Sequence, residues 1–275
     1  KKLTEDFVKS HLPKRPKRAN KGNFGKLIVI AGSENFPGAA YLSCAAAYRV
    51  GAGLVTLVTD RDTKIIISKQ LPELTFLPYN QVFEKVNDYD VILLGPGLDQ
   101  KEETVELVRK ILESKLPKVV IDADGINILS QLDSWWEKLN CETILTPHPG
   151  EMSRLTGLSI EGIQKDRVNI AQRFAKKWGQ TVVLKGANTV VASSDGRIFV
   201  SPFANPILAT AGTGDVLAGI IPGLLAQGLD AINAANVGVY IHGLAGETLK
   251  EKIGNAGALA SDLLRLLPQI LKKLR

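Results

Sequence analysis

The segment ATAGTGDVLAGIIPGLL, which begins at Ala209, contains the residues best suited to hold a phosphoryl group. Gly212, Thr213 and Gly214 place backbone N–H groups at the start of an expected helix, where unpaired donors and the helix dipole favour an anion. Glycine is needed there because a side chain would block the approach of the anion to the backbone. We therefore predict that these three residues form an anion hole.

Asp215 follows the anion hole within the first turn of the same helix. A lone acidic residue in a first turn usually only complements the helix dipole. Negative charge beside a bound phosphate is unfavourable, however, unless it has a chemical task such as accepting a proton from an attacking hydroxyl. We interpret Asp215 as a catalytic base. Neither standard nucleotide fingerprint is present, since no Lys-Ser or Lys-Thr pair follows and Leu217 replaces the third glycine of a dinucleotide loop.

A histidine between two prolines lies in the segment LTPHPGEM, at the end of an apolar run. Pro147 and Pro149 stiffen the backbone around His148, and Glu151 falls in the first turn of the next expected helix. A lone histidine is more often structural than functional. The position at the end of a strand makes a ligand-binding role for His148 equally reasonable, and both roles stay open on this pattern alone.

Three further loops follow apolar runs, at residues 94–98, 121–125 and 184–189. Gly97 would let a ligand lie against the backbone. Asp122 and Asp124 either cap the next turn or hold a metal ion through water, and capping is the better interpretation of each alone. Lys185 either contacts a nucleotide phosphate or is an ordinary lysine beside a turn. No metal site formed by side chains is predicted, because the two cysteines are far apart and no histidine has zinc-ligand spacing.

Short apolar runs alternate with helical patterns along the chain, and these elements must position the loops. Strands are predicted at 27–31, 54–58, 91–95, 119–123 and 143–147, with three more in 181–201; helices are predicted at 38–50, 102–112, 149–156, 159–177, 214–226, 230–249 and 256–266. Continuous Val, Ile and Leu runs are typical of a parallel sheet covered on both faces. We predict an α/β fold, a three-layer αβα sandwich with a mostly parallel central sheet, which binds ligands at the carboxyl ends of its strands.

The composition is that of a soluble globular protein, with 275 residues, 45% hydrophobic and 23% charged. The longest apolar run, Gly219 to Ala226, is interrupted by Pro222 and is too short to span a membrane. Only Cys44 and Cys141 are present, which excludes a disulfide scaffold and suits a reducing compartment. We expect a cytoplasmic protein with no membrane partner.

The net charge of +6 is concentrated at one end of the chain. Residues 1–26 contain nine Lys or Arg and two acidic residues, whereas the rest of the chain carries −1. Thr4, followed by two acidic residues, predicts a short helix that ends before Pro13. The basic arm after it lacks the interleaved aromatic residues that stack on bases, so no nucleic-acid partner is expected. We predict an N-terminal helix and arm at 1–26 and a single catalytic domain at 27–275.

Six motifs, in this order, carry a resemblance to a known family: KGNFGK, GSENFPGAA, GPGL, DADGIN, TPHPGE and AGTGDVLAG. GTGD alone is shared by many ribokinase-like kinases, but the combination is much more specific. From Lys21 to the C-terminus the chain resembles the NAD(P)H-hydrate dehydratases, ribokinase-like enzymes that repair hydrated NADH and NADPH (NADHX and NADPHX). The resemblance implies a ribokinase-like fold, a homotetramer, and dehydration of the 6S hydrate with ADP or ATP and Mg²⁺.

The resemblance also implies roles for particular residues. Asp215 would be the catalytic residue and would deprotonate the hydroxyl of the hydrate, which is phosphorylated before phosphate is eliminated. The residues expected to contact the hydrated dinucleotide are Ala39, Gly97, His148 and Asp215. Those expected to contact the adenine nucleotide are Lys185, Gly186, Ala187, Asn188, Thr189 and Gly214.

Two other functions stay open on the sequence. One is a ribokinase-like kinase for a small alcohol such as a vitamin precursor, which would share the anion hole and Asp215. The other is a non-catalytic adenine-nucleotide-binding module, in which Asp215 is only a helix cap. Nothing in the sequence decides between ADP and ATP, or between NADHX and NADPHX. The family also occurs fused behind an epimerase domain and this chain has no initiator Met, so it is expected to derive either from such a fusion or from a single-domain protein.

Overall fold

The computed structural model describes all residues from 1 to 275, and its centre is a nine-stranded sheet. The strands are β1 (Lys26–Ile30), β2 (Leu54–Val58), β3 (Thr75–Leu77), β4 (Val91–Leu94), β5 (Lys118–Ile121), β6 (Thr143–Leu145), β7 (Thr181–Leu184), β8 (Val190–Ala192) and β9 (Ile198–Val200). Their order across the sheet is β3-β2-β1-β4-β5-β6-β7-β8-β9. Neighbours are parallel from β3 to β7, and β8 runs antiparallel to β7 and β9.

The strand order reverses direction between β1 and β4. The chain builds β1, β2 and β3 toward one edge, then crosses back and adds β4 to β9 on the other side of β1. Loops that leave neighbouring strands on either side of such a point diverge, which opens a crevice at the carboxyl ends of the strands. The loops after β1 and β4 therefore border a natural place for a ligand.

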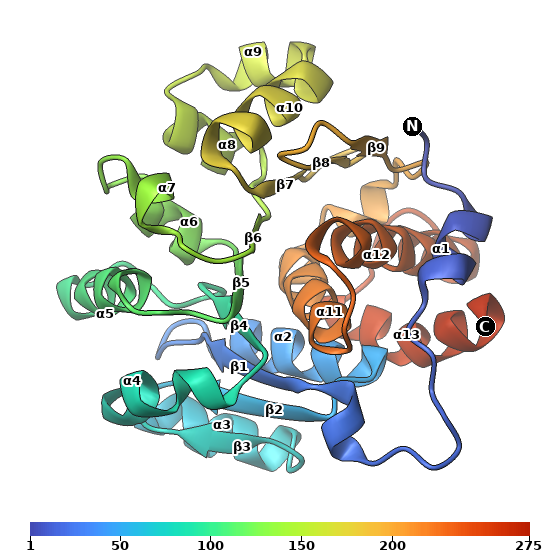
Figure 1. The fold of residues 1–275 in the computed structure, drawn as a ribbon. Coiled ribbons are helices and arrows are strands. Elements are labelled where there is room, and N and C mark those ends of the chain that lie inside the picture. The colour runs from blue at the N-terminus through green and yellow to red at the C-terminus, as the bar shows by residue number, and fades with distance from the viewer.

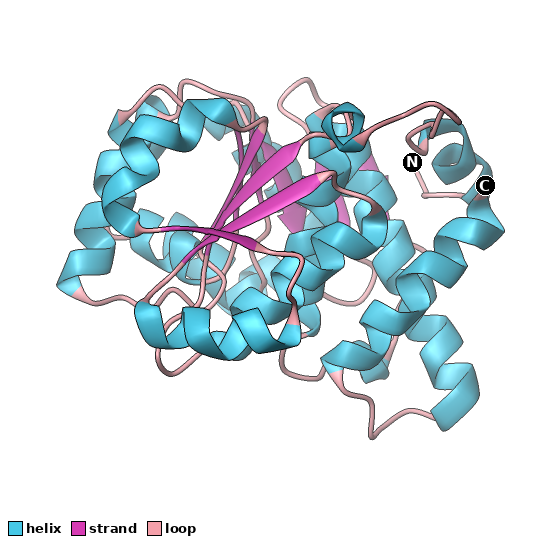
Figure 2. Ribbon diagram, turned by 90° about the horizontal axis from the view of Figure 1, so that it is seen from below, coloured by secondary structure: helices cyan, strands magenta, loops and turns pink.

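Helices cover both faces of this sheet, as Figures 1 and 2 show. One face is covered by α2 (Pro37–Val50), α11 (Thr213–Ala226), α12 (Ala231–Ile253), α13 (Ala260–Leu274) and α3 (Arg61–Gln70), with α1 (Glu5–His11) packed on α12 and α13. The other face is covered by α5 (Glu102–Glu113), α6 (Asp124–Leu129), α7 (Trp135–Lys138), α8 (Pro149–Thr156), α9 (Ile160–Lys165) and α10 (Arg167–Trp178). The short helix α4 (Val82–Lys85) follows β3. The predicted three-layer sandwich with a mostly parallel sheet is confirmed.

Each strand supplies both hydrophobic cores, because alternate side chains point to opposite faces. In β1, Leu27 and Val29 belong to the core under α2 and α11, while Ile28 and Ile30 belong to the core under α5 and α6. All four side chains are fully buried. This double burial explains why the strands are continuous apolar runs in the sequence.

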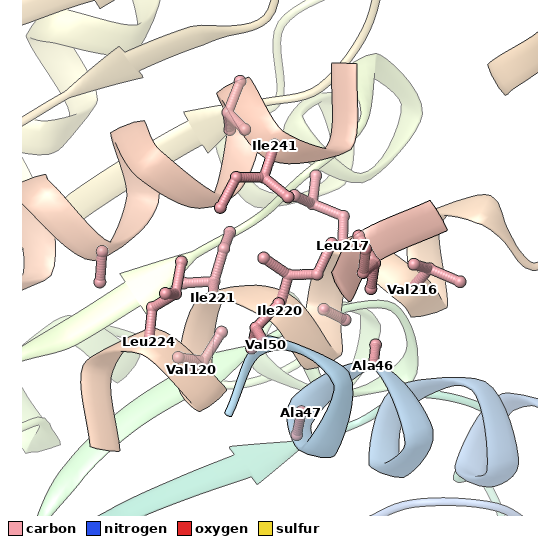
Figure 3. Packing of buried hydrophobic residues seen from close by; sticks show 14 of the residues in the cluster. Ala46, Ala47, Val50, Val120, Val216, Leu217, Ile220, Ile221, Leu224 and Ile241 are labelled. Carbon is pink, nitrogen blue, oxygen red and sulfur yellow. The ribbon is translucent and has the colours of Figure 1, made fainter. Parts of the chain in front are cut away.

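The closest helix packing in the protein joins α2 and α11 (Figure 3). A Cβ placed on Gly219 of α11 would lie 2.0 Å from the backbone oxygen of Ser43 in α2, so only glycine fits there. Ala46 and Ala47 of α2 face Ile220 and Leu224 of α11 in the same contact. The small residues of α2 thus set the position of α11, whose first turn carries Asp215.

Three helices differ in extent from the sequence-based expectation. The helix expected at 230–249 continues to Ile253. The helix expected at 159–177 is two helices, because Asp166 leaves helical geometry with φ −141° and ψ 54°. The last helix begins at Ala260 instead of 256 and continues through Pro268 to Leu274. β3 was not predicted, since three residues are too few to give a pattern. None of the helices combines the length and apolarity needed to cross a membrane.

The N-terminal residues contact two distant parts of the domain. Lys1 donates its terminal amino group to the oxygen of Ile198 at 2.8 Å, and Leu3 donates its N–H to Val200 at 3.0 Å, beside the edge strand β9. Thr4 caps α1 as predicted, accepting from the N–H of Phe7. The basic arm then crosses to the opposite end of the sheet, where the Arg15 guanidinium stacks 3.6 Å from the ring centre of Phe24.

Candidate active site

The loop before α11 leaves the first N–H groups of this helix without a side-chain cap. Gly212 has φ +88°, a left-handed conformation that strains any other residue. The Thr213 hydroxyl donates to the backbone oxygen of Leu208 at 2.6 Å, so this side chain ties down the preceding loop. On the other side, Nε2 of the buried His242 lies 2.9 Å from the Thr213 oxygen and donates to it. The first N–H groups of α11 are thus free of side-chain caps, as an anion hole requires.

Asp215 lies in the first turn of α11 and is half-buried. Burial raises the pKa of Asp215 to about 7, and the negative charge of Asp122 acts in the same direction while Lys185 opposes it. Its carboxylate makes no hydrogen bond to the rest of the protein. A carboxyl group with a pKa near neutrality and free oxygens is well suited to act as a general base.

Lys185 leaves β7 and extends its ammonium group among three carboxylates. Its Nζ lies 2.5 Å from Oδ1 of Asp122 and 3.7 Å from Oε2 of Glu151. Burial alone would lower the pKa of Lys185, but the charges of Asp122, Glu151 and Asp215 outweigh it and raise the pKa above its ordinary value. Lys185 is therefore positively charged at neutral pH. Its Nζ lies near the N-terminus of α11, since a Cβ placed on Gly214 would be 3.9 Å from it.

The capping role expected for Asp122 and Asp124 is wrong. Asp122 is 1% exposed and accepts from Lys185 and from the hydroxyl of Thr146, the latter at 2.6 Å. Asp124 accepts from the backbone N–H of Asp99 at 3.1 Å and so joins the loop after β5 to the loop after β4. α6 begins at Asp124, and its N-cap position is occupied by Ala123, which has φ +49° and cannot cap with its side chain.

His148 and Glu151 cap each other at the start of α8. Nδ1 of His148 accepts from the N–H groups of Gly150 and Glu151 at 3.0 and 3.2 Å, and Oε2 of Glu151 accepts from the His148 N–H at 2.7 Å. Burial, with Lys185 nearby, lowers the pKa of His148. The ring is neutral at pH 7 with its proton on Nε2. Half of the His148 side chain is exposed, so Nε2–H is available to a ligand as well as to Glu151.

The loop between β7 and β8 contains the predicted nucleotide contacts. Gly186 has φ +140°, and Asn188 has φ +52° with its side chain donating to the Ser201 oxygen at 3.0 Å. Arg167 of α10 donates to the oxygens of Leu184 and Ala187 and so fixes the outer side of this loop.

A cavity of about 740 Å³ joins this loop to the N-terminus of α11. Its polar lining includes the predicted residues His148, Lys185, Gly186, Ala187, Thr189, Gly212, Thr213 and Gly214. Its apolar lining includes Phe203, Leu208, Leu217 and Val239. Such a cavity, lined by apolar side chains and by backbone N–H donors, suits a base and its phosphates.

Four predicted residues do not line this cavity: Asn188, Asp215, Ala39 and Gly97. The last two lie together. A Cβ placed on Gly97, in the loop after β4, would be 2.7 Å from the Cβ of Ala39 in the first turn of α2. The candidate residues thus form two groups, one at Ala39 and Gly97 and the other around Lys185. Ala39 lies on α2 and Gly214 on α11, and these two helices pack side by side (Figure 1).

Two features of the candidate site were not predicted from the sequence: the apolar wall of the cavity and the burial of Glu151. The apolar wall formed by Phe203 and Leu208 comes from the segment FANPIL, which has no regular pattern. Burial also raises the pKa of Glu151 to about 7, Lys185 opposes this, and Asp122 adds to it. The acid was visible in the sequence, but its burial was not. The structure contains no group of three or more His, Cys, Asp or Glu side chains that could hold a metal ion.

Comparison with known proteins agrees with this geometry. A family model described as NAD(P)H-hydrate dehydratase matches residues 27–269. The ADP/ATP-dependent NAD(P)H-hydrate dehydratase of Bacillus subtilis, crystallised with ATP and Mg²⁺, superimposes with a TM-score of 0.89 and 34% identity, over 99% of this chain and 98% of that one. A ribokinase-like superfamily protein from Enterococcus faecalis superimposes with a TM-score of 0.89 and 32% identity, over 100% and 96%.

The fold is that of a ribokinase-like α/β protein, with a cavity beside the N-terminus of α11. Among such proteins, the chain belongs to the NAD(P)H-hydrate dehydratase family. The bifunctional NAD(P)H-hydrate repair enzyme of Moorella thermoacetica is 39% identical over 99% of this chain. The chain spans about half the length of the bifunctional curated relatives it matches.

Proposed function

We propose that this chain dehydrates the 6S hydrate of NADH or NADPH with ADP or ATP as phosphoryl donor. The observation that carries the proposal is the position of Asp215 in the first turn of α11, where no side chain caps the helix. Its carboxylate makes no hydrogen bond, its pKa is raised to about 7, and it interacts with the charge of Lys185. Family membership supplies the substrate class, since the names of the relatives specify these hydrates.

In the first step the hydroxyl oxygen of the hydrate attacks the terminal phosphorus of the nucleotide. The new O–P bond forms as the phosphoanhydride bond breaks, and Asp215 accepts the hydroxyl proton. The backbone N–H groups of Gly212 to Gly214 stabilise the charge on the transferring phosphoryl group. Mg²⁺ bound with the nucleotide neutralises phosphate charge, and few protein ligands are expected for it.

In the second step the phosphate leaves with the C–O bonding electrons. The lone pair of the ring nitrogen assists, and the neighbouring ring carbon loses a proton as the double bond forms. Lys185 contributes a fixed positive charge toward the departing phosphate, held in place by Asp122 and Glu151. Phosphorylation is needed because hydroxide is a poor leaving group.

The substrate contacts follow from the two groups of residues. Ala39, Gly97 and His148 would contact the dinucleotide, whose reacting ring lies toward Asp215. The adenine nucleotide would occupy the 740 Å³ cavity beside the loop from Lys185 to Thr189 and Gly214.

A coupled assay tests the proposed reaction against its rivals. We expect phosphate with AMP, or phosphate with ADP, to be released only when NADHX or NADPHX is present, together with recovery of absorbance of the reduced nicotinamide. A stable phosphorylated product would indicate a small-molecule kinase. No nucleotide consumption with either hydrate would indicate a binding module.

We also propose a homotetramer in the cytoplasm. Several large apolar side chains are exposed near the ends of helices, among them Phe36 (52%), Ile160 (52%), Ile253 (48%) and Leu259 (64%). Burial of such side chains between subunits is favourable. Light scattering at micromolar concentration is expected to give four times the chain mass, and a monomer would contradict this. An origin in a fusion with an epimerase domain also stays a proposal.

A further inference from the structure

A second cavity, of about 670 Å³, opens at the crevice where the strand order reverses. Its walls are the loops after β1, β2, β3 and β4, with α4 and α5. None of the residues assigned to the reaction lines it. Its lining includes Ser33, Asp60, Tyr79, Phe83, Asp99 and Glu103.

This cavity begins where the proposed dinucleotide contact ends. The Ser33 hydroxyl donates to the backbone oxygen of Gly97 at 2.9 Å, and Leu98 and Asp99 continue from Gly97 into the cavity wall. Gly97 in turn touches Ala39. The contact between Ala39, Phe36 and Gly97 therefore adjoins the wall of the cavity.

The distance across the sheet suits a dinucleotide. Neighbouring strands are about 4.8 Å apart, so the loop after β2 lies about 15 Å from Asp122 at the end of β5. An extended dinucleotide carries its two nucleosides at opposite ends of a pyrophosphate. A substrate with its reacting ring at Asp215 must place its other nucleoside some distance away along the same edge of the sheet.

The cavity also offers a surface for a base. Phe83 exposes 39% of its area although it is large and apolar, and Tyr79 lines the same cavity. Exposed aromatic side chains stack favourably on nucleic-acid bases of any type. An adenine ring against Phe83 would bury surface that is otherwise in water.

The charge of the cavity is opposite to that of the chain as a whole. It is lined by six carboxylates, Glu34, Asp60, Asp62, Asp99, Glu103 and Glu106, and three cations, Arg61, Lys101 and Lys110. Two of the cations are already paired, Lys101 with Asp99 at 3.2 Å and Lys110 with Glu106 at 3.5 Å. Four of the carboxylates, Glu34, Asp60, Asp62 and Glu103, have no ion-pair partner, and Asp60 caps α3.

We infer that this cavity receives the adenosine half of the hydrated dinucleotide and selects the form without a 2′-phosphate. The inference rests on the proposed function. Carboxylates near the ribose accept hydrogen bonds from free hydroxyl groups, whereas a 2′-phosphate, with nearly two negative charges, is repelled by them. NADHX is therefore the preferred substrate over NADPHX.

The test compares the phosphorylated and unphosphorylated dinucleotides. We expect kcat/KM for NADHX to exceed that for NADPHX at least about tenfold at saturating ADP. Fluorescence titration is expected to show the same order for the products NADH and NADPH. Charge reversal with Glu34→Lys and Asp62→Lys is expected to shift both ratios toward the phosphorylated forms by at least about fivefold. Phe83→Ala is expected to raise KM for both hydrates and leave KM for ADP unchanged.

A matched control separates the local effect from the change in net charge. Glu113→Lys with Glu161→Lys alters the charge equally on exposed helical positions outside the cavity, and both ratios are expected to stay constant. Equal dissociation constants for NADH and NADPH, unaffected by the cavity variants, would overturn the inference even if both hydrates are turned over. A retained preference for NADH without any turnover would overturn the proposed reaction and leave the cavity assignment standing.

Discussion

Nζ of Lys185 lies 2.5 Å from Oδ1 of Asp122, although the two residues are 63 positions apart in the chain. They leave β7 and β5, which are separated in the sheet only by β6. Asp122 therefore fixes the position of Lys185, whose charge also acts on Asp215 at the start of α11.

Asp122→Asn is expected to destabilise the protein by up to about 3 kcal/mol. The substitution leaves a mostly buried ammonium group with one of its two ion-pair partners removed, and loss of one member of a buried pair is costly. Urea unfolding at pH 7 measures the change. Asp195→Asn is the control, because its ion pair with Arg197 is exposed and contributes little. Equal midpoints for both variants would contradict the role given to Asp122.

Asp215→Asn is expected to lower kcat by at least about a hundredfold. The amide keeps the shape of the side chain but cannot accept the proton, and a positioned general base contributes about 10²- to 10⁴-fold. Nucleotide affinity is expected to stay constant or improve, because a negative charge near the phosphates is removed. Steady-state kinetics and nucleotide titration measure the two effects. A variant with most of its turnover would show that Asp215 is structural.

The same base predicts how activity depends on pH. Since the pKa of Asp215 is raised to about 7, kcat/KM is expected to rise with pH up to about 7 and then level off. Glu151 has a similarly raised pKa, so Glu151→Gln is the control and is expected to keep the rising limb. The residual activity of Asp215→Asn is expected to lack it.

His148→Ala is expected to raise KM for the hydrate much more than it lowers kcat. The neutral ring presents Nε2–H beside the cavity and keeps its Nδ1 in the cap of α8, so it can orient a ligand but does not take up a proton near pH 7. His148→Asn, which keeps a capping oxygen, serves as control for helix stability. Equal losses in kcat and kcat/KM would mean that His148 acts in the transition state.

The parts of the protein with local sequence signals were predictable. Apolar runs gave the buried strands, and the glycines around Thr213 indicated an anion-binding helix. The pairing of Asp122 with Lys185 was not predictable. Nothing in either segment specifies that β5 and β7, which carry these residues, are separated in the sheet only by β6. The break at Asp166 was also missed, since it depends on the packing of α9 and α10 and no proline or glycine marks it. Gly97 was singled out because a glycine after an apolar run lets a ligand approach the backbone, whereas Ala39 was predicted only through the family resemblance.

His242 is expected to make the protein sensitive to acid. Burial lowers its pKa to about 4, although its bond to Thr213 opposes this effect. A lowered pKa contributes stability that is present above about pH 6.5 and is lost as the pH falls toward 4, which amounts to about 3 kcal/mol. The free energy of unfolding of the wild type is therefore expected to fall more steeply over this interval than that of His242→Gln. Parallel curves would show that His242 does not stay neutral in the folded state.

Gly219→Ala is expected to reduce both stability and activity, because α2 and α11 touch at this residue. The added Cβ would lie 2.0 Å from the Ser43 oxygen, so the helices must separate, and such overpacking costs about 1 to 3 kcal/mol even though alanine favours the helix. Gly38→Ala is the control for stability, since a Cβ there has no neighbour within 4 Å. The separation would also move Ala39 relative to Asp215, and a shift of about 1 Å between reacting groups can cost about a hundredfold in rate. Thermal unfolding and kcat/KM for NADHX measure the two losses together. Full activity in a destabilised Gly219→Ala variant would show that the contact between α2 and α11 stabilises the fold without setting the geometry of the site.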